Sequence, residues 1–343
     1  MTEVSVTVIV PVRNEAGFIR STLQALLDQI EAPARYEVLV VDGISDDGTR
    51  DIVHEMGRAD SRLRLLDNPT RTVPTALNIG IKAASGEVLI RVDGHTTVAS
   101  DFVRANLALL AEHPEAWSVG GPIAHRGQTR VGRAIARAMA SRIGVGGASH
   151  RNEAYEGYAE GTAFPAFRRW VFDRVGLFDE HLIRNQDDEL NFRITRAGGM
   201  IFISPRVKHE YFVRDSYRAL FTQYMQYAYW KVEVMRKHRR VIAPRHLVPG
   251  IFVIALPVCA GAALLLPLPV ALIPAAPLAG YAGLLGWLAV SVAARERDVR
   301  VGLGAAAAAA TMHVAYGIGT IFGMFSRARE GTSVEHLMTR LTR

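Results

Sequence analysis

The sequence predicts an α/β domain with an open, Rossmann-like sheet, followed by transmembrane α-helices. Two patterns lead to this prediction. Four apolar, β-branched runs occur before residue 95, and a helix-like stretch follows each of them. Charged residues are common up to about residue 245, whereas residues 247–294 contain no Asp, Glu, Lys, Arg or His. The first pattern indicates a soluble sheet domain, and the second indicates a membrane segment.

The four runs predict strands at 4–12, 36–43, 63–68 and 86–94, and the stretches after them predict helices at 15–30, 46–59, 73–85 and 100–113. Strands that alternate with helices at this spacing form parallel βαβ units, which bind ligands at the carboxyl ends of their strands. The hydrophobicity of the runs is continuous rather than alternating. Helices are therefore expected to cover both faces of the sheet.

Polar residues gather where three of these strands end. They are Arg13, Asn14 and Glu15 after the first strand, Asp42, Ser45, Asp46 and Asp47 after the second, and Asp93 and His95 after the fourth. A single Asp in such a place is usually a helix N-cap, and this reading remains open for Asp47. Carboxylates at three strand ends on one sheet edge instead predict a ligand site.

Two groups of residues have the chemistry for metal-assisted transfer of a group to a hydroxyl. A divalent cation can neutralise the charge on a departing phosphate, and Asp93 and His95 offer ligands for one at a rigid strand end. Gly94 between them lets the backbone approach the ligand. An attacking hydroxyl needs a carboxylate as a base, which the acids at 187–189 can supply. These acids begin a helix-like run, so Asp188 and Glu189 can instead serve only the helix N-terminus.

Other readings of the sequence are less well supported. The stretch "GVGGAS" (144–149) resembles a dinucleotide-binding loop, but no convincing strand precedes it and no clear helix follows it. Cys259 is the single cysteine, which excludes a disulfide framework. The net charge of +7 comes with basic clusters beside the apolar segments. Anionic lipid and phosphate-bearing substrates explain this charge better than nucleic acid does.

The uncharged segment predicts about three membrane spans, at 247–266, 275–293 and 301–325. As one helix, residues 247–294 would be about 70 Å long, against a bilayer core of about 30 Å, so the chain must fold back. "PLP" (267–269) and "PAAP" (274–277) provide the break. Basic residues at 231–240 and 295–300 flank the first two spans and place the N-terminal part in the cytoplasm, at the inner membrane. A buried helical core is the alternative.

Five motifs occur in the order seen in one enzyme family: "VIVPVRNEAGFI", "VLVVDGISDDGT", "ALNIGIKAASGEVLIRVDGHT", "AFRRWVFDRVGLFDE" and "NQDDELNFRITRAGG". Over about residues 4–240 the chain resembles inverting family 2 glycosyltransferases, in particular the membrane-attached enzymes of exopolysaccharide assembly such as succinoglycan glucosyltransferases. The resemblance implies a GT-A fold and a nucleotide-diphosphate sugar donor. It also implies transfer, with UDP-glucose as the best match and a β-linked product, to a lipid-linked glycan acceptor.

The resemblance also assigns residues to roles. Asp187 falls on the catalytic base. The nucleotide-sugar-binding candidates are Pro11, Arg13, Glu15, Asp42, Arg71, Arg91, Asp93 and Gly94. Asp93 and His95 fall on the metal-binding D-x-D motif, with His209 as a third ligand, and the imidazoles favour Mn²⁺ over Mg²⁺. The acceptor-side candidates are Gly161, Thr162, Gln186, Asp188, Gln226 and Trp230. In "QYAYW" (226–230) Tyr229 replaces an arginine typical of processive polymerases, which favours single addition.

These assignments predict a glycosyltransferase domain at 1–212, an interfacial amphipathic helix region at 213–245, the membrane spans at 246–326 and a tail at 327–343. The expected partners are the donor, a lipid-linked acceptor and membrane lipid. Two alternatives remain open. In a polyprenyl-phosphate sugar synthase, a lipid phosphate would attack, with Arg184 and Arg193 near Asp187. A nucleotide-sugar-binding membrane protein without turnover is the other. The sequence leaves the oligomeric state undetermined.

Overall fold

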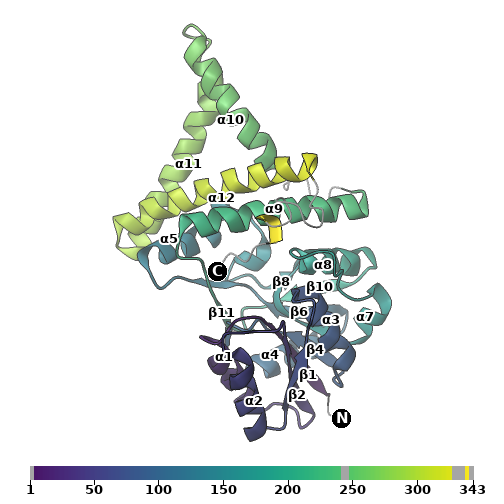
Figure 1. Ribbon diagram of the computed structural model, residues 1–343. Coiled ribbons are helices and arrows are strands. Elements are labelled where there is room, and N and C mark those ends of the chain that lie inside the picture. Colours follow the sequence, from purple (N-terminus) through teal and green to yellow (C-terminus); the bar gives the residue numbers. More distant parts are fainter. Residues whose placement is uncertain (1–3, 241–246, 327–336, 340–343) are drawn as a thin grey trace. The chain divides into compact units, whose positions relative to one another are not determined.

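The computed structural model describes residues 4–240, 247–326 and 337–339 (Figure 1). The chain forms two compact units, and each of them is built from two separate parts of the sequence. Unit 1 comprises Met1–Ala124 and Ser149–Tyr211, and unit 2 comprises His125–Ala148 and Phe212–Arg343. Segment 125–148 therefore belongs to the same unit as the C-terminal helices, a division that the sequence pattern does not reveal.

An eight-stranded mixed sheet forms the centre of unit 1, with the strand order β3-β2-β1-β4-β9-β6-β10-β8. Its strands are β1 (Val6–Val12), β2 (Tyr36–Asp42), β3 (Leu63–Asp67), β4 (Val88–Arg91), β6 (Ala116–Gly121), β8 (Gly157–Tyr158), β9 (Ala163–Arg168) and β10 (Met200–Ile203). The first four are parallel, which confirms the predicted βαβ units. Strand β9 lies antiparallel between β4 and β6, so the sheet changes direction at its centre.

Helices cover both faces of this sheet, as the continuous apolar runs predict. One buried cluster joins Val8 and Val10 of β1 to α1 (Ile19–Leu27), α2 (Thr49–Ala59) and α4 (Phe102–Glu112). The cluster on the other face joins Ile9 to α3 (Val73–Ala83), α7 (Trp170–Val175) and α8 (Gln186–Arg196). Neighbouring β1 residues alternate between the faces, which is how one strand supports two cores.

A short pairing outside the main sheet joins two distant parts of unit 1. Strand β5 (Thr97–Val98) pairs antiparallel with β11 (His209–Phe212), and His209 stands opposite Val98. Because Val98 follows closely after Asp93 and His95, this pairing brings the backbone of His209 to the segment that follows β4. Strand β5 lies outside the strands predicted from the sequence.

The described residues of unit 2 are mainly helical, and β7 (Ala124–Arg126) adds a short strand. The helices are α5 (Arg130–Met139), α6 (Arg142–Val145), α9 (Tyr217–His238), α10 (Val248–Leu265), α11 (Leu272–Glu296) and α12 (Val299–Phe325). The last three are long and apolar enough to cross a membrane by length and composition, as expected for candidate spans. Helix α11 begins at Leu272, before "PAAP", so Pro274 lies in its first turn, where proline is tolerated, and Pro277 lies inside the helix. The chain therefore breaks at "PLP" alone.

Segment 125–148 is held in unit 2 by ion pairs and by a hydrogen bond. Arg133 and Arg137 of α5 contact the carboxylate of Glu296, at 3.3 and 2.6 Å. The ring Nε2 of His313 in α12 lies 2.8 Å from the carbonyl oxygen of Ile143 in α6. These contacts join the segment to helices that lie more than 150 residues later in the chain.

Candidate active site

The loops that follow β1 and β2 are joined by hydrogen bonds between backbone amides and side chains. The amide of Asn14 donates to Oγ of Ser45 at 2.8 Å, and that of Glu15 donates to Oγ1 of Thr49 at 2.8 Å. The amide of Ala16 donates to Asp47 at 3.0 Å. Asp47 and Ser45 therefore fix the loop that carries Glu15, which is more than the N-cap role considered for Asp47.

Asp42 ends β2 as a fully buried carboxylate with partners for both oxygens. The amide and hydroxyl of Ser45 donate to it, and Arg50 donates to Oδ2 at 2.8 Å. Arg50 also contacts Asp67 at the end of β3, again at 2.8 Å. These contacts offset the cost of burying a charge and fix two strand ends together. The contact of Asp42 with a nucleobase stays a prediction.

Two candidate arginines lie on either side of Gly43. A Cβ added to Gly43 would lie 3.3 Å from Cβ of Arg13 and 3.4 Å from Cα of Arg71. The backbone of Arg71 is in the left-handed region, with φ 62°, and its amide donates to the carbonyl oxygen of Asn68. The loops after the first three strands thus bring the side chain of Arg13 and the backbone of Arg71 to one place, where the sequence predicts nucleotide binding. Pro11, also a candidate, lies buried in β1 opposite Val41.

The turn after β4 is packed tightly against the end of β1. The side chain of Arg91 contacts Oδ1 of Asp93 at 3.0 Å. A Cβ on Gly94 would lie 2.7 Å from Cγ1 of Val12, a distance that real Cβ atoms do not adopt. The hydroxyl of Thr22 donates to the carbonyl oxygen of Gly94 at 3.0 Å. Glycine is therefore required here for packing against β1, while the approach of a ligand to this backbone stays a prediction.

His95 is paired with Glu15, its partner from the loop after β1. The Glu15 carboxylate lies 2.9 Å from Nδ1 of the imidazole, and both side chains are largely buried. A carboxylate accepts hydrogen bonds, so Nδ1 of His95 carries a proton and donates the hydrogen bond. The sequence placed both residues at one sheet edge but did not reveal this contact.

His209, the third predicted metal ligand, is a buried imidazole. Within the described part of the chain, neither of its ring nitrogens has a hydrogen-bond partner. Burial lowers its pKa to about 4, so the ring is neutral at pH 7, which is the form that binds metals. Its ring packs edge-on against Phe164, with 4.7 Å between the ring centres.

Asp93, His95 and His209 are the candidate ligands for a divalent cation. One carboxylate and two imidazoles suit Mn²⁺ better than Mg²⁺, which prefers oxygen ligands. Among the residues that the structure describes, no three His, Cys, Asp or Glu side chains form a group that could hold a metal ion. Asp93 and His95 are instead engaged by Arg91 and Glu15. The chemistry of the residues fits Mn²⁺, while their convergence on one ion stays a prediction.

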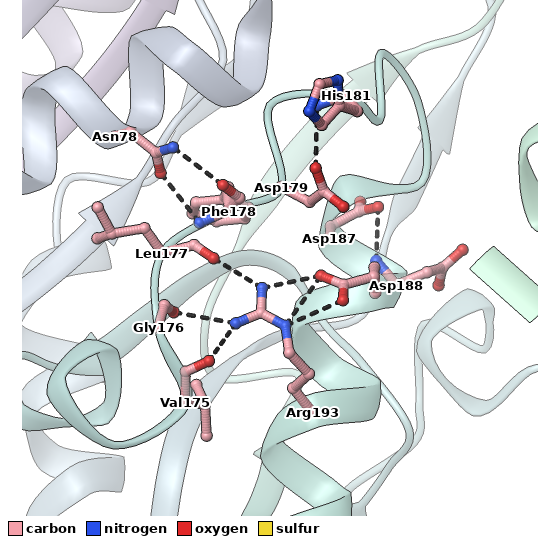
Figure 2. Close-up of polar contacts among 11 residues, drawn as sticks. Asn78, Val175, Gly176, Leu177, Phe178, Asp179, His181, Asp187, Asp188 and Arg193 are labelled. Atoms are coloured by element: carbon pink, nitrogen blue, oxygen red, sulfur yellow. Dashed lines mark hydrogen bonds and ion pairs between the residues drawn. The ribbon is translucent and has the colours of Figure 1, made fainter. Parts of the chain in front are cut away.

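The three consecutive acids at the start of α8 have different environments (Figure 2). Asp187 is exposed, Asp188 is half-buried, and Glu189 is fully buried. Asp187 accepts a hydrogen bond from the amide of Asp188 at 2.8 Å. The residue before the helix, Asn185, adopts the left-handed conformation with φ 58°, which starts the helix abruptly. Asp187 is therefore the most accessible of the three carboxylates.

Glu189 has a structural partner in Arg193, one helical turn later. Nη2 of Arg193 lies 2.8 Å from the Glu189 carboxylate and 2.7 Å from the carbonyl oxygen of Leu177. The same guanidinium also donates to the carbonyl oxygens of Val175 and Gly176 (Figure 2). The pair thus joins α8 to the end of α7. The sequence signal for it is the spacing of four residues between an acid and an arginine on a helix.

The acceptor-side candidates fall into two groups. Gly161 faces α8, because a Cβ there would lie 2.7 Å from the side-chain nitrogen Nδ2 of Asn191. Thr162 donates to the carbonyl oxygen of Gly121 at 3.1 Å, and Gln186 is buried in the first turn of α8. Gln226 and Trp230 lie in α9 of unit 2 and donate to the carbonyl oxygens of residues 337 and 338.

A mixed sheet with a parallel N-terminal half, and with carboxylates, arginines and histidine at the ends of those strands, defines a GT-A glycosyltransferase. The model of "Glycosyl transferase family 2" matches residues 7–175. The succinoglycan biosynthesis protein ExoA of Rhizobium meliloti is 32% identical over 93% of this chain and 94% of its own length. The chain therefore belongs to glycosyl transferase family 2, as the sequence motifs predict.

Two further proteins are similar over most of their length. A dolichyl N-acetyl-alpha-D-glucosaminyl phosphate 3-beta-D-2,3-diacetamido-2,3-dideoxy-beta-D-glucuronosyltransferase of Methanococcus voltae is 27% identical over 68% of this chain and 74% of its own. Among solved structures, the mannosyltransferase PcManGT from Pyrobaculum calidifontis, in complex with GDP-Man and Mn²⁺, has a TM-score of 0.66 at 23% identity. That likeness covers 95% of this chain and 88% of that chain, and it shows the shared fold.

Proposed function

We propose that this glycosyltransferase moves glucose from UDP-glucose to a lipid-linked glycan acceptor, with a β-linked product, in the synthesis of an exopolysaccharide or cell-surface polysaccharide. The similarity to a succinoglycan biosynthesis protein over nearly the whole chain supports the polysaccharide pathway. A lipid acceptor agrees with three helices apolar enough to enter a membrane, and with a relative whose name describes transfer to a dolichyl-phosphate-linked sugar. The proposed place of action is the cytoplasmic face of the inner membrane.

The observation that carries the catalytic proposal is the exposure of Asp187 beside the buried Glu189–Arg193 pair. Glu189 is occupied in holding α8, which leaves Asp187 to take the proton from the acceptor hydroxyl. With one base and no second carboxylate acting as a nucleophile, the sugar is displaced in a single in-line step. An α-linked donor then gives a β-glycoside.

Asp93, His95 and His209 are the residues we assign to a divalent cation, with Mn²⁺ preferred over Mg²⁺. The bound cation would neutralise the charge that develops on the leaving diphosphate. We assign Arg13 and Arg71, near Gly43, to the negatively charged donor. A fold relative is in complex with GDP-Man and Mn²⁺, which agrees with a nucleotide-sugar donor and a divalent cation.

The environment of Arg193 argues against the polyprenyl-phosphate synthase alternative. In that mechanism a lipid phosphate attacks, and basic residues beside Asp187 would have to attract it. Arg193 instead binds Glu189 and three carbonyl oxygens of the α7–α8 segment. Its guanidinium is already satisfied, so of the two arginines named for this alternative only Arg184 remains a candidate for attracting a lipid phosphate, and we favour hydroxyl attack with Asp187 as the base.

The proposal is tested with the full chain in lipid nanodiscs, supplied with UDP-glucose, Mn²⁺ and an extracted lipid-linked glycan. We expect UDP release together with a lipid-linked product whose anomeric proton coupling shows a β-linkage. Asp93→Ala should lose metal-dependent donor binding, whereas Asp101→Ala, at the start of α4, should keep it. An α-linked product would contradict the single displacement. Donor binding without any transfer or hydrolysis would favour the non-catalytic alternative.

A further inference from the structure

Helix α12 packs along α9 in a parallel arrangement (Figure 1). Near their starts, the hydroxyl of Tyr217 in α9 donates to the carbonyl oxygen of Gly304 at 3.1 Å. Near their ends, Nη2 of Arg236 donates to the carbonyl oxygen of Met324 at 2.8 Å. The two contacts are about 30 Å apart along α12, because each residue adds about 1.5 Å to a helix. The two helices therefore remain together over a distance equal to the thickness of a bilayer core.

Glycines of α12 make this close approach possible between the two ends. A Cβ on Gly319 would lie 2.2 Å from the carbonyl oxygen of Met225, and one on Gly323 would lie 3.0 Å from Cβ of Val232. Gly319 thus excludes any larger residue at the contact with α9. The packing is continuous rather than limited to a crossing point.

Helix α9 is too polar to cross a hydrocarbon core. It carries Arg218 near its start and Lys231, Glu233, Arg236 and Lys237 in its last third, and it is not among the helices apolar enough to cross a membrane. Charged residues within spanning helices are rare and costly. Helix α9 therefore lies outside the bilayer core, and a helix that follows it for its full length has both of its ends on the same side.

The surface of α12 that faces away from α9 is apolar. Leu303, Ala307, Val314, Ile318 and Phe325 recur at helical spacing and are exposed or half-buried. The opposite face is packed against other helices. In the most apolar 18-residue stretch of each helix, 44% of the residues are buried in α12, against 6% in α10 and 17% in α11. Helices α10 and α11 pack on each other and expose apolar side chains nearly all round. One face of α12 thus continues the apolar surface of the α10–α11 hairpin.

We infer that α12 lies along the membrane surface, with this apolar stripe on the acyl chains of one leaflet, and that only the α10–α11 hairpin enters the bilayer. The chain then returns to the side from which it entered. Gln226 and Trp230 of α9 donate to the carbonyl oxygens of Leu337 and Met338, so these later residues lie on that same side. The inference concerns the membrane topology and does not depend on the proposed activity.

Depth measurements with spin labels test this placement directly. Single cysteines replace Leu303, Val314 or Phe325 in a Cys259→Ala background, and the labelled full-length protein is reconstituted in lipid nanodiscs. Accessibility to oxygen and to a polar nickel complex gives the depth of each label. We expect equal, shallow depths at all three positions, and a deep label at Leu284→Cys in the middle of α11. A label that is deep at Val314 and shallow at the other two would overturn the inference.

Reporter fusions provide a second measurement that does not depend on labelling. A fluorescent protein or an alkaline phosphatase is joined before residue 1 or after residue 343 of the otherwise unchanged chain. We expect both ends to give the same reporter response, because α12 adds no crossing. Opposite responses at the two ends would show three crossings and refute the surface placement.

Discussion

The carboxylate of Glu15 and Nδ1 of His95 lie 2.9 Å apart, although 80 residues separate them in the sequence. The contact joins the loop after β1 to the turn after β4. It orients the imidazole and fixes the proton on Nδ1, so that Nε2 is the nitrogen able to bind a cation. In the proposed metal site, Glu15 acts as a positioning residue for His95.

Replacing Glu15 with Ala should weaken Mn²⁺ binding by about 10–100-fold, the usual effect of removing a residue that orients a metal ligand. Glu15→Gln keeps an oxygen that can accept a hydrogen bond from Nδ1–H, so its Mn²⁺ affinity should fall less. Free Mn²⁺ measured by electron paramagnetic resonance, in the presence of UDP, gives both affinities. Equal Mn²⁺ affinity in the wild type and Glu15→Ala would exclude the positioning role.

Asp187→Asn should lower kcat by about 10²–10⁴-fold, because the amide cannot accept a proton from the acceptor. The affinity for the donor should change little, since the base acts on the acceptor. Asp188→Asn is the matched control and should have a milder effect, because Asp188 supplies a backbone amide to Asp187. Steady-state kinetics of UDP release separates the two. A larger loss of kcat in Asp188→Asn than in Asp187→Asn would identify Asp188 as the base.

Glu189→Gln should destabilise the protein rather than change its catalysis selectively. Removing one partner of a buried ion pair costs about 3–5 kcal/mol, and Glu189 is fully buried beside Arg193. The expected result is a clear fall in the melting temperature measured by scanning fluorimetry. Glu55→Gln removes a carboxylate from the exposed pair with Arg20 and should change the melting temperature little. Equal melting temperatures for the two variants would show that the buried pair is not structural.

His209 predicts a pH dependence of stability in protein treated with EDTA. Burial lowers its pKa from 6.5 to about 4, so between these values the unfolded chain binds a proton that the folded protein does not. The free energy of unfolding should therefore fall as the pH falls from 6.5 to 4, by up to about 3 kcal/mol from this group. His209→Phe should show a shallower fall in melting temperature over the same range. Identical slopes in both proteins would rule out a buried neutral His209.

The sequence predicted the parallel half of the fold because its signals are local. The runs that became β1 to β4 are continuous and apolar, and each is followed by a complete helix pattern. The antiparallel strand β9 could not be placed in the same way, since its position between β4 and β6 depends on pairing with residues far along the chain. Segment 125–148 is a similar case. Its helix α5 is amphipathic, but the pattern does not identify α12 as its partner.

The convergence of the strand ends that carry the candidate residues was also predicted. Strand ends placed Glu15, Asp93 and His95 on one edge, because parallel strands share their direction. The roles within the acidic run could not be separated by composition, since Asp187, Asp188 and Glu189 have similar side chains. Burial separates them in the structure: only Glu189 has lost its contact with solvent and gained Arg193. Such differences depend on packing and have no signal in the local sequence.

The partnership between α5 and α12 sets an order of events during synthesis. About 170 residues separate the two helices, and a ribosome adds roughly 5–20 residues per second, so α5 waits about 10–30 s for its partner. Its buried residues include Ile135 and Met139, and α12 is the helix against which α5 packs most extensively. The nascent chain therefore exposes the apolar face of α5 while β8 to α11, residues 157–296, are translated. Synthesis beside the membrane, where lipid can cover that helix, would protect the chain from aggregation.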